Sequence, residues 1–397
     1  MTHPDIADAL EHLPLIDHHV HGALRIDLDR AALEDVITES DRPRRAGTTN
    51  FDSQFGLAVR KFCAPLLGLA DFASPEEYVT ARLALGAREV NTRLLRAAGL
   101  GALIIDTGFA AGDLTDLTQT AELSGAPTYE VVRLEAVAEQ LVREDVGAQE
   151  FATRVREVLF EARARGAVGT KSIAAYRYGL DVPSARPHDH DVTRAATAWL
   201  RDCAATGTIR IGDPVLLSFL MWCGIDLGNP LQIHIGYGDS DINLVRANPA
   251  LLTDFLKASE SSGASVMLLH CYPYHREAAY LAQMFPHVFF DVGEAINYSG
   301  LQSHQVIRES LEIAPFSKQL YSSDGWGPVE LHFLGARLWR NAMTRILSEW
   351  VAEDHCRVAD AVRIANMIGR DNAQSVYPLG DNPDTAARRA TANTLRH

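Results

Sequence analysis

Two histidines near the N-terminus have a spacing that suits a metal ion. They lie in Leu13-Pro-Leu-Ile-Asp-His-His-Val-His-Gly22, an apolar stretch that becomes polar towards its end. If this stretch is a strand, His19 and His21 point to the same face, because side chains two residues apart do so. An isolated His-x-His is more often a pair of ordinary polar residues. The pair therefore predicts a metal site only if later strands also end in ligands.

Four further side chains that could bind a metal or substrate follow later strand-like segments. They are Lys171 in 167–175, His234 in 231–236, His270 in 265–271 and Asp324 in 319–325. Each has an ordinary explanation, since a histidine can cap a core strand and Asp324-Gly325 alone is typical of a turn. Six accidents in this order are improbable, and the set together predicts one metal centre.

The segments that must position these residues alternate between strand and helix patterns. Strand-like segments occur at 13–22, 101–108, 128–134, 167–175, 231–236, 265–271, 288–292 and 319–325. Helical patterns occur at 31–38, 76–98, 139–165, 192–206, 214–223, 249–262, 276–284, 330–352 and 358–375. Parallel strands need such crossovers, so the chain is predicted to be an α/β protein, a (β/α)8 TIM barrel with its site at the carboxyl ends of the strands. An open doubly wound sheet is the alternative, but no Gly-x-Gly-x-x-Gly follows a strand.

The domain prediction is one barrel over residues 1–380 with a polar C-terminal tail at 381–397. A helical insertion of about residues 24–98 follows the first strand, and Ser74-Pro-Glu-Glu77 is a good helix start. Long insertions of this kind often cover an active site.

Composition excludes several classes of partner. The 397 residues are 47% hydrophobic and carry a net charge of −14, which disfavours nucleic acid. No apolar run is long enough for a membrane span, and the N-terminus does not read as a signal peptide. Five scattered cysteines without Cys-x-x-Cys indicate a reduced, cytoplasmic protein. We expect a small-molecule substrate, no nucleic acid, no membrane and a homo-oligomer.

The ordered set resembles the metal-dependent amidohydrolase superfamily. That family has His-x-His on its first strand, often Lys on the fourth, His on the fifth and sixth, and Asp on the eighth. The stretches 169–177 (GTKSIAAYR), 234–239 (HIGYGD) and 321–325 (YSSDG) are similar to the amidohydrolase-2-like domain that some proteins carry fused to a glutamine synthetase. The synthetase half is absent here.

The resemblance implies a divalent metal, zinc first and manganese or iron as alternatives, as one ion or two. A dinuclear centre would place one ion on His19, His21 and Asp324 and the other on His234 and His270, with a carboxylated Lys171 as the bridge. A mononuclear centre would use His19, His21, His234 and Asp324, leaving His270 to hydrogen-bond the attacking water or the substrate carbonyl. Lys171 would then stay charged and bind a substrate carboxylate. By resemblance, Asp324 also carries the proton from water to the leaving group.

Other residues past the strand ends are candidates for substrate binding. They are Tyr176, Arg177, Tyr237, Asp239, Glu294 and Trp326. Arg177 could clamp a carboxylate, although a surface salt bridge is an equal alternative. Glu294 could meet a substrate amine or cap a helix. The loop motif His188-Asp-His190 is predicted to be solvated, and His275 is a secondary ligand candidate.

The predicted function is a metal-dependent hydrolase that cleaves the C–N bond of an amide in a small, carboxylate-bearing substrate. Asp324 and His270 are the expected catalytic residues. A bound divalent ion lowers the pKa of water, and the resulting hydroxide can attack a carbonyl. A decarboxylase or a sugar-acid isomerase is the alternative on the same site, although Lys171 counts against the decarboxylase. A non-catalytic scaffold barrel would instead bind no metal.

Overall fold

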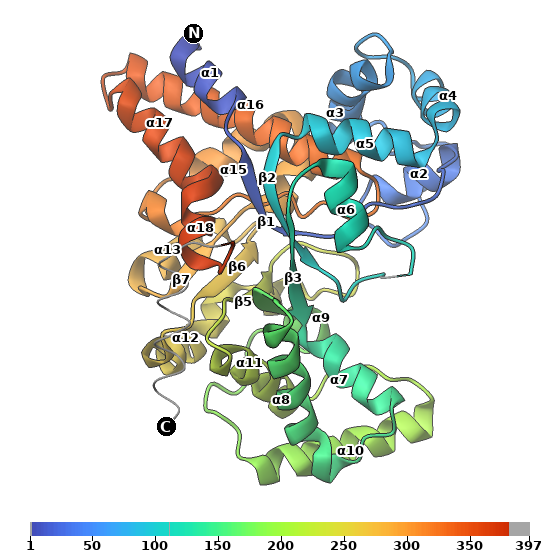
Figure 1. Ribbon diagram of the computed structural model, residues 1–397, viewed down its shortest axis with the longest axis vertical. Coiled ribbons are helices and arrows are strands. Elements are labelled where there is room, and N and C mark those ends of the chain that lie inside the picture. The colour runs from blue at the N-terminus through green and yellow to red at the C-terminus, as the bar shows by residue number, and fades with distance from the viewer. Residues whose placement is uncertain (1, 111, 381–397) are drawn as a thin grey trace. The chain divides into compact units, whose positions relative to one another are not determined.

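The computed structural model describes residues 2–110 and 112–380, which divide into two units (Figure 1). The first unit comprises residues up to 128 together with 238–240 and 291–373. Of the described residues, the second comprises 129–237, 241–290 and 374–380. The tail predicted at 381–397 lies outside the described residues.

The first unit contains a parallel strand pair that carries the N-terminal histidines. Strands β1 (Leu15–Val20) and β2 (Leu100–Asp106) pair from Leu15 opposite Leu100 to Val20 opposite Ile105. All six residues of β1 are buried. The strand predicted around His19 and His21 is therefore confirmed, as is the one predicted at 101–108.

The segment predicted as an eighth strand, 319–325, is not a regular strand. It runs beside β1, where the His18 amide donates to the Tyr321 carbonyl at 3.2 Å and the His21 amide donates to the Gly325 carbonyl at 2.8 Å. Asp324 has a left-handed backbone with φ of +50°, which interrupts extended geometry. The segment thus reaches the expected position by hydrogen bonding without regular strand geometry.

The α-helices of the first unit are α1 (Pro4–Glu11), α2 (Arg30–Val36), α3 (Gln54–Ala58), α4 (Pro75–Leu85), α5 (Ala87–Ala97), α6 (Leu117–Ser124), α14 (Gly293–Ser299), α15 (Ser303–Ser310), α16 (Glu330–Ala352) and α17 (Val358–Asn366). The longest of them is α16, which begins shortly after Asp324 and contacts α1, α5, α14, α15 and α17 (Figure 1). Helix α18 (Asn372–Val376) spans the boundary between the units.

The insertion is helical, but its predicted helix at 76–98 is two helices. Gly86 separates α4 from α5 with φ of +78° and ψ of 153°, a conformation that glycine adopts without a Cβ penalty. The predicted start of α4 is confirmed, since Ser74 and Glu77 form a reciprocal capping box.

A buried ion pair attaches the insertion to α16. The Glu330 carboxylate accepts from the Tyr78 hydroxyl at 2.7 Å and from Arg82 Nε at 3.0 Å, and these three side chains are buried. Burial alone would raise the pKa of Glu330, but Arg82 and Tyr78 hold that pKa below its ordinary value. The charge on Glu330 is therefore compensated inside the core.

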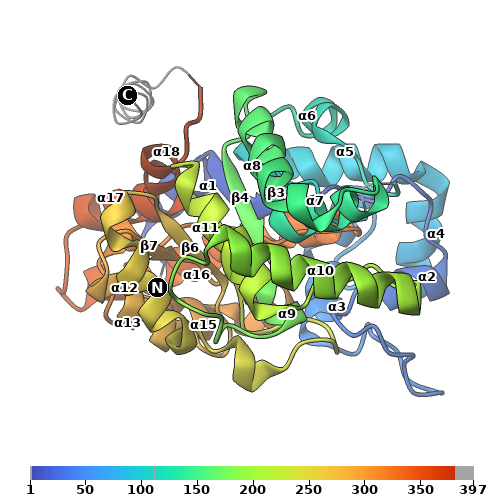
Figure 2. The same ribbon diagram turned by 90° about the horizontal axis from the view of Figure 1, so that it is seen from below.

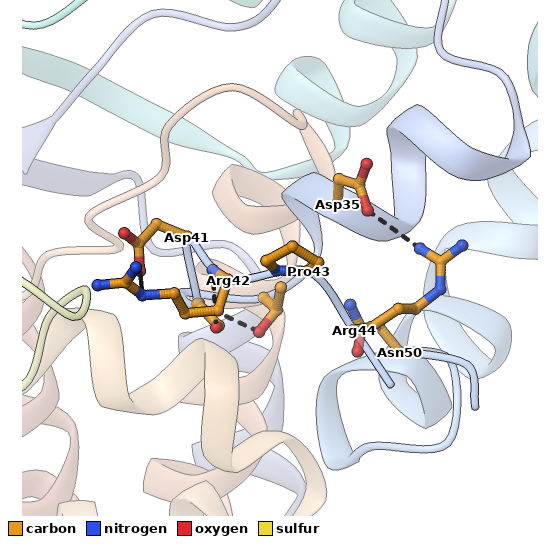
Figure 3. A pocket seen from close by; sticks show the side chains of 8 residues that line it. Asp35, Asp41, Arg42, Pro43, Arg44 and Asn50 are labelled. Carbon is orange, nitrogen blue, oxygen red and sulfur yellow. Dashed lines mark hydrogen bonds and ion pairs between the residues drawn. The ribbon is translucent and has the colours of Figure 1, made fainter. Parts of the chain in front are cut away.

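The polar loop of the insertion encloses a pocket of about 440 Å³ (Figure 3). Both arginines that line the pocket have partners. Arg44 donates to Asp35 at 3.0 Å, and Arg42 donates to the Ser240 hydroxyl at 3.0 Å and lies 3.7 Å from Asp41. Arg44 also lies 3.3 Å from Glu34. Because carboxylates already balance these charges, the pocket offers no strong anion site.

The second unit contains five parallel strands in chain order. They are β3 (Thr128–Arg133), β4 (Gly169–Ser172), β5 (Leu231–Ile235), β6 (Val266–His270) and β7 (Val288–Phe290). Lys171 pairs with Arg133 on one side and with Gln232 on the other, and His270 pairs with Ile235. The order of strands is that expected of successive right-handed crossovers.

The helices of the second unit supply those crossovers. They are α7 (Leu134–Arg143), α8 (Ala148–Ala164), α9 (Ala174–Arg177), α10 (Asp189–Thr206), α11 (Pro214–Asp226), α12 (Thr253–Ser259) and α13 (His275–Met284). Helices α8, α10 and α11 lie side by side, and α7 and α11 pack against β4 (Figure 2). The predicted helix at 139–165 is wrong as one element, because Asp145 has φ of +58° and ends α7.

Parallel strands joined by helices confirm the predicted α/β class. Closure into a (β/α)8 barrel stays a prediction, as does the single domain over residues 1–380. Among the described residues, no helix combines the length and apolar character needed to cross a membrane.

Candidate metal centre

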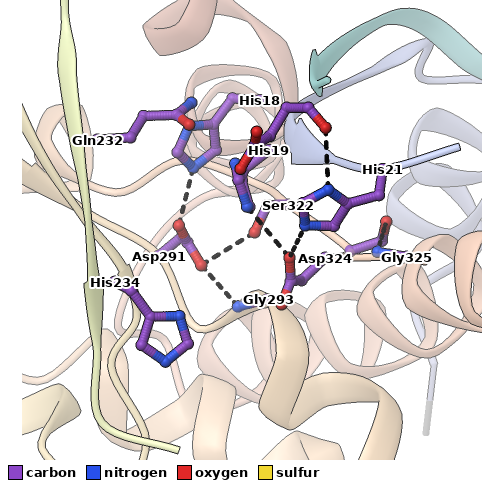
Figure 4. A network of polar contacts seen from close by, with 12 residues as sticks. His18, His19, His21, Gln232, His234, Asp291, Gly293, Ser322, Asp324 and Gly325 are labelled. Carbon is purple, nitrogen blue, oxygen red and sulfur yellow. Dashed lines mark hydrogen bonds and ion pairs between the residues drawn. The ribbon is translucent and has the colours of Figure 1, made fainter. Parts of the chain in front are cut away.

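Three of the predicted ligands meet in the first unit at the carboxyl end of β1. Asp324 Oδ1 lies 3.2 Å from His19 Nε2 and 3.7 Å from His21 Nε2 (Figure 4). His19 is fully buried, and the Asp324 side chain is 11% exposed. The two histidines point to one face of the strand, as the His-x-His spacing predicts.

These distances fit a divalent metal. Ligands of one tetrahedral zinc ion, each bound at roughly 2.0–2.2 Å, lie about 3.4 Å apart. His21 Nδ1 donates to the backbone carbonyl of Asp106 at 3.1 Å, so a neutral His21 presents a lone pair on Nε2 towards the Asp324 carboxylate. Two acceptors this close repel one another unless a cation or a proton lies between them. The donor set therefore matches the requirement of a divalent metal ion.

A second layer of buried polar groups fixes this end of β1. His18 Nε2 hydrogen-bonds Asp291 Oδ2 at 2.9 Å, and Asp291 Oδ1 accepts from the Ser322 hydroxyl at 2.9 Å and the Gly293 amide at 2.7 Å (Figure 4). Such partners orient metal ligands and restrict their motion. The sequence did not single out His18 or Asp291.

Asp17 belongs to the same layer. Its carboxylate accepts from both the amide and the hydroxyl of Ser323, next to Asp324. Burial raises the pKa of Asp17 to about 7, against the opposing hydrogen bonds from Ser323 and with added repulsion from Asp291. Asp17 thus ties β1 to the segment that carries Asp324.

Asp106 is a candidate ligand that sequence reasoning missed. Ligand atoms of His19, His21 and Asp106 all lie within 4.8 Å of one another, and the three residues are buried. The available signal was its place in the predicted strand 101–108, where apolar residues give way to Asp-Thr-Gly. Nothing local distinguished it from other aspartates that follow strands.

The remaining predicted ligands all lie in the second unit. His234 and His270 are 4% and 1% exposed, and their ring centroids are 4.6 Å apart. Lys171 is 2% exposed on β4. The structure therefore groups three predicted ligands in each unit, and the joining of both groups in one centre stays a prediction.

The orientation of His234 is fixed by its own loop. Its Nε2 donates to the Tyr237 carbonyl at 2.8 Å, so Nδ1 would be the metal-binding atom. The loop needs glycine at 236, because a Cβ there would lie 2.2 Å from the Tyr272 carbonyl oxygen. That close approach lets the Tyr237 amide donate to the same carbonyl at 2.7 Å.

Two predicted substrate-binding residues sit on the short helix α9. The Tyr176 ring centroid lies 4.5 Å from that of His234, which places Tyr176 beside a predicted ligand. Arg177 instead forms a partly buried ion pair with Glu139 at 3.2 Å. Burial lowers the pKa of Arg177, and Glu139 opposes that shift. The charge of Arg177 is therefore already balanced within the second unit.

Three other substrate-binding candidates gather in the first unit around Glu39 of the insertion. The Tyr298 hydroxyl donates to Glu39 Oε2 at 3.2 Å, and Trp326 and Glu294 also hydrogen-bond Glu39. Burial raises the pKa of Glu39 to about 7; the Tyr298 bond opposes the shift and Asp239 adds to it. Glu39 lies in an aperiodic polar loop, where the sequence carries no signal for such a role.

The secondary histidines lie apart from these groups. His188 and His190 are exposed at the start of α10, with parallel rings 5.5 Å apart. His275 is buried as the first residue of α13 and its ring stacks parallel to that of Tyr272 at 6.1 Å. Neither position belongs to the metal-binding groups found among the described residues.

Comparison with known proteins agrees with this geometry. No protein-family model matches the chain. A protein from Lactobacillus casei ATCC 334, provisionally named a metal-dependent hydrolase, matches 97% of this chain and 98% of its own, with 29% identity and a TM-score of 0.80. The chain is similar to a metal-dependent hydrolase over almost its whole length. The predicted resemblance to metal-dependent amidohydrolases is thereby confirmed.

Two further likenesses are more limited. Protein fluG of Emericella nidulans is 28% identical over 421 residues, covering 96% of this chain and 48% of fluG, so the hydrolase-like chain spans about half of that protein's length. A uronate isomerase from Thermotoga maritima shares the fold at a TM-score of 0.60 with 13% identity, covering 94% of this chain and 96% of its own.

Proposed function

We propose that this protein is a metal-dependent hydrolase that cleaves the C–N bond of an amide in a small, carboxylate-bearing substrate. The observation that carries the proposal is the arrangement of His19, His21 and Asp324, whose facing atoms have the spacing of metal ligands. The Lactobacillus casei protein, which matches the chain along its length, supports the reaction class.

The ion would be held by His19, His21 and Asp324, with His234, His270 and Lys171 joining from the second unit. Neutral imidazoles and carboxylates suit zinc first, and manganese or iron as alternatives. When bound, such an ion activates water at neutral pH and polarises a carbonyl. With two ions, a carboxylated Lys171 would bridge them; with one, a charged Lys171 would bind the substrate carboxylate.

Asp324 is proposed to move the proton during the reaction. Its side chain is 11% exposed and that of His21 is 9% exposed, whereas His19 is fully buried, so Asp324 is the acidic member of the group with some access to solvent. The carboxylate would take a proton from the attacking water and return it to the departing nitrogen, which needs it to leave as an amine. With a single ion, His270 would instead hydrogen-bond the attacking water or the substrate carbonyl.

The surroundings of Glu39 suggest the other end of the substrate. Glu294, Asp239 and Glu39 place three carboxyl groups near the Trp326 indole, a setting that favours an ammonium group. Together with a carboxylate bound by Lys171, this would favour an amide of an amino acid. Tyr176, Tyr237 and Arg177 are proposed to line the pocket from the second unit, Arg177 with its charge shared by Glu139.

An isomerase or decarboxylase on the same site is the second candidate. Uronate isomerases share the fold, as does a glucuronate isomerase from Caulobacter crescentus with a TM-score of 0.63 and 14% identity. Identity at that level bears on the fold alone. We further propose that the protein is a homo-oligomer and that it is cytoplasmic. The second proposal is in line with the five cysteines, which form no disulfide among the described residues.

Metal stoichiometry tests the proposal directly. Elemental analysis of protein purified without chelators should find zinc, manganese or iron, and amide hydrolysis should be lost on chelation and regained with metal. Two ions per chain would support the carboxylated Lys171 bridge and hydrolysis. One ion per chain would favour a charged Lys171, and the protein would then also be assayed for uronate isomerisation and for decarboxylation. Protein that binds no metal, even with added zinc or manganese, would reject the proposal.

A further inference from the structure

We infer that Asp106, at the carboxyl end of β2, is a further ligand of the ion bound by His19 and His21. This inference rests on the proposed function and deepens it. Asp106 is 1% exposed, and one of its carboxylate oxygens lies within 4.8 Å of a ring nitrogen of each histidine. Ligation would need shifts of only about an ångström to reach zinc-like distances of roughly 2.0–2.2 Å.

Two contacts hold Asp106 in this position. Its Oδ1 accepts from the Gly108 amide at 2.9 Å, which fixes the side-chain rotamer, and its backbone carbonyl accepts from His21 Nδ1 at 3.1 Å. The second contact sets the tautomer that leaves His21 Nε2 able to bind a metal. Asp106 therefore orients one ligand with its main chain while its carboxylate lies beside both histidines.

Asp291 provides an internal comparison. It also follows a strand, and its Oδ1 accepts from the amide two residues later, Gly293, at 2.7 Å. Its second oxygen faces His18 Nε2 at 2.9 Å. In both aspartates, one carboxylate oxygen accepts from the backbone amide two residues later, and at least one histidine ring lies near the carboxylate. His18 is a single partner for Asp291, whereas Asp106 meets a pair of histidines that can share a cation.

The Asp106 carboxylate would balance the charge of the bound divalent ion. Two neutral imidazoles and the Asp324 carboxylate leave a divalent ion with one uncompensated positive charge, and burying a net charge is costly. The Asp106 carboxylate supplies the second negative charge within the first unit. The ion is then neutralised even if Lys171 is not carboxylated, so the lysine could remain a cation for the substrate.

Metal titration of Asp106→Asn against Asp113→Asn tests the inference. Asp113 is an exposed aspartate in the loop after β2, so its variant makes the same change of charge without reaching the histidines. The probe is Co2+ added to metal-free protein, followed by its visible absorption and by competition with a chelator. We expect Asp106→Asn to weaken binding by more than about 100-fold and to change the Co2+ spectrum, because a ligand is lost. Asp113→Asn should behave like the unmodified protein.

Other outcomes separate the inference from the proposed function. Weakening of about 10- to 100-fold with an unchanged spectrum would mean that the Asp106 side chain acts only by fixing the turn at Gly108, and would overturn the inference. Unchanged affinity would overturn it as well, while leaving the proposed function standing. An unmodified protein that binds no Co2+ or Zn2+ would overturn both. If Asp106→Asn does not fold, as judged by circular dichroism, Asp106→Ala takes its place: it removes the carboxylate, and an unaltered Co2+ spectrum and affinity would overturn the inference.

Discussion

The chain contains two His-x-His motifs whose surroundings differ completely. His19 lies in the buried strand β1 and His21 follows directly after its end, and both Nε2 atoms face the Asp324 carboxylate at 3.2 and 3.7 Å. His188 is the N-cap of α10 and His190 is its second residue; both are exposed, and the His190 side chain is 73% exposed and lies 3.3 Å from Asp191. The same spacing brings both rings to a third polar group only in the buried motif, where the rings follow a strand.

Energetics accounts for the difference. At the exposed pair, a metal would have to order two mobile side chains and compete with water, which costs conformational entropy. At the buried pair, folding has already fixed the rings, and removing the ion leaves close acceptors facing one another. We therefore expect metal affinity to depend more on the buried strand and the side chains around a His-x-His motif than on the motif itself.

Replacing Asp324 is the strongest way to break the buried arrangement. Asp324→Asn should reduce turnover on the order of 100- to 10,000-fold, because asparagine cannot accept the proton of the attacking water. The fold should survive, since the amide fills the same space. Steady-state kinetics with circular dichroism would check this, and a fully active, folded variant would remove Asp324 from the proton transfer.

The two motifs can be compared directly by removing histidines from each. His19→Ala should lower metal affinity on the order of 100- to 1,000-fold, since about 10–16 kcal/mol of binding is shared among about four ligands. The double variant His188→Ala/His190→Ala should retain the metal content of the unmodified protein. Elemental analysis of both preparations shows which motif holds the metal. Loss of metal from the double variant would place the metal site at His188 and His190.

The layer behind the buried pair can be tested by pH. His332 Nε2 donates to the His21 carbonyl at 3.0 Å, and burial lowers the pKa of His332 to about 4 despite that hydrogen bond. In the unfolded chain, His332 becomes protonated below a pH of roughly 6.5, whereas in the folded protein it becomes protonated only near pH 4. The unfolded state is therefore favoured increasingly as the pH falls from about 6.5 to about 4, and the folded protein loses stability over that range.

The expected size of this loss is about 3 kcal/mol. It should appear as a change in the difference in unfolding free energy between the unmodified protein and His332→Gln, measured by urea denaturation from pH 7.5 to 4. Because the other titrating groups are common to both proteins, they cancel in the difference. A difference that stays constant with pH would mean that the pKa of His332 is the same in the folded and unfolded states, against the expected lowering.

Sequence patterns were sufficient where local chemistry decides structure. The alternation around His19 and His21, the capping box at Ser74 and the helix at 330–352 all follow from short-range spacing and were confirmed. The approach of Asp324 to both histidines also followed, because the predicted segments share one edge. Each of these features depends on few residues and on the geometry of one element.

The rest depended on contacts that no local pattern records. The breaks at Gly86 and Asp145 reflect positive φ values within otherwise good helical periodicity. Asp106 and Glu39 acquire their surroundings only when distant segments pack, and both resembled ordinary polar residues in the sequence. The irregular course at Asp324 likewise arises from a backbone conformation that composition does not reveal.

The buried Tyr78–Arg82–Glu330 group limits how the insertion could be exchanged. Helix α4 belongs to the insertion, whereas Glu330 begins α16, only six residues beyond Asp324. A chimera that replaced the insertion alone would leave the Glu330 carboxylate buried without Tyr78 and Arg82, which would lower the free energy of unfolding by about 3–5 kcal/mol. The insertion therefore cannot be exchanged independently of the rest of the unit. Any change to the insertion that aims at a new substrate preference would also require changes at the start of α16.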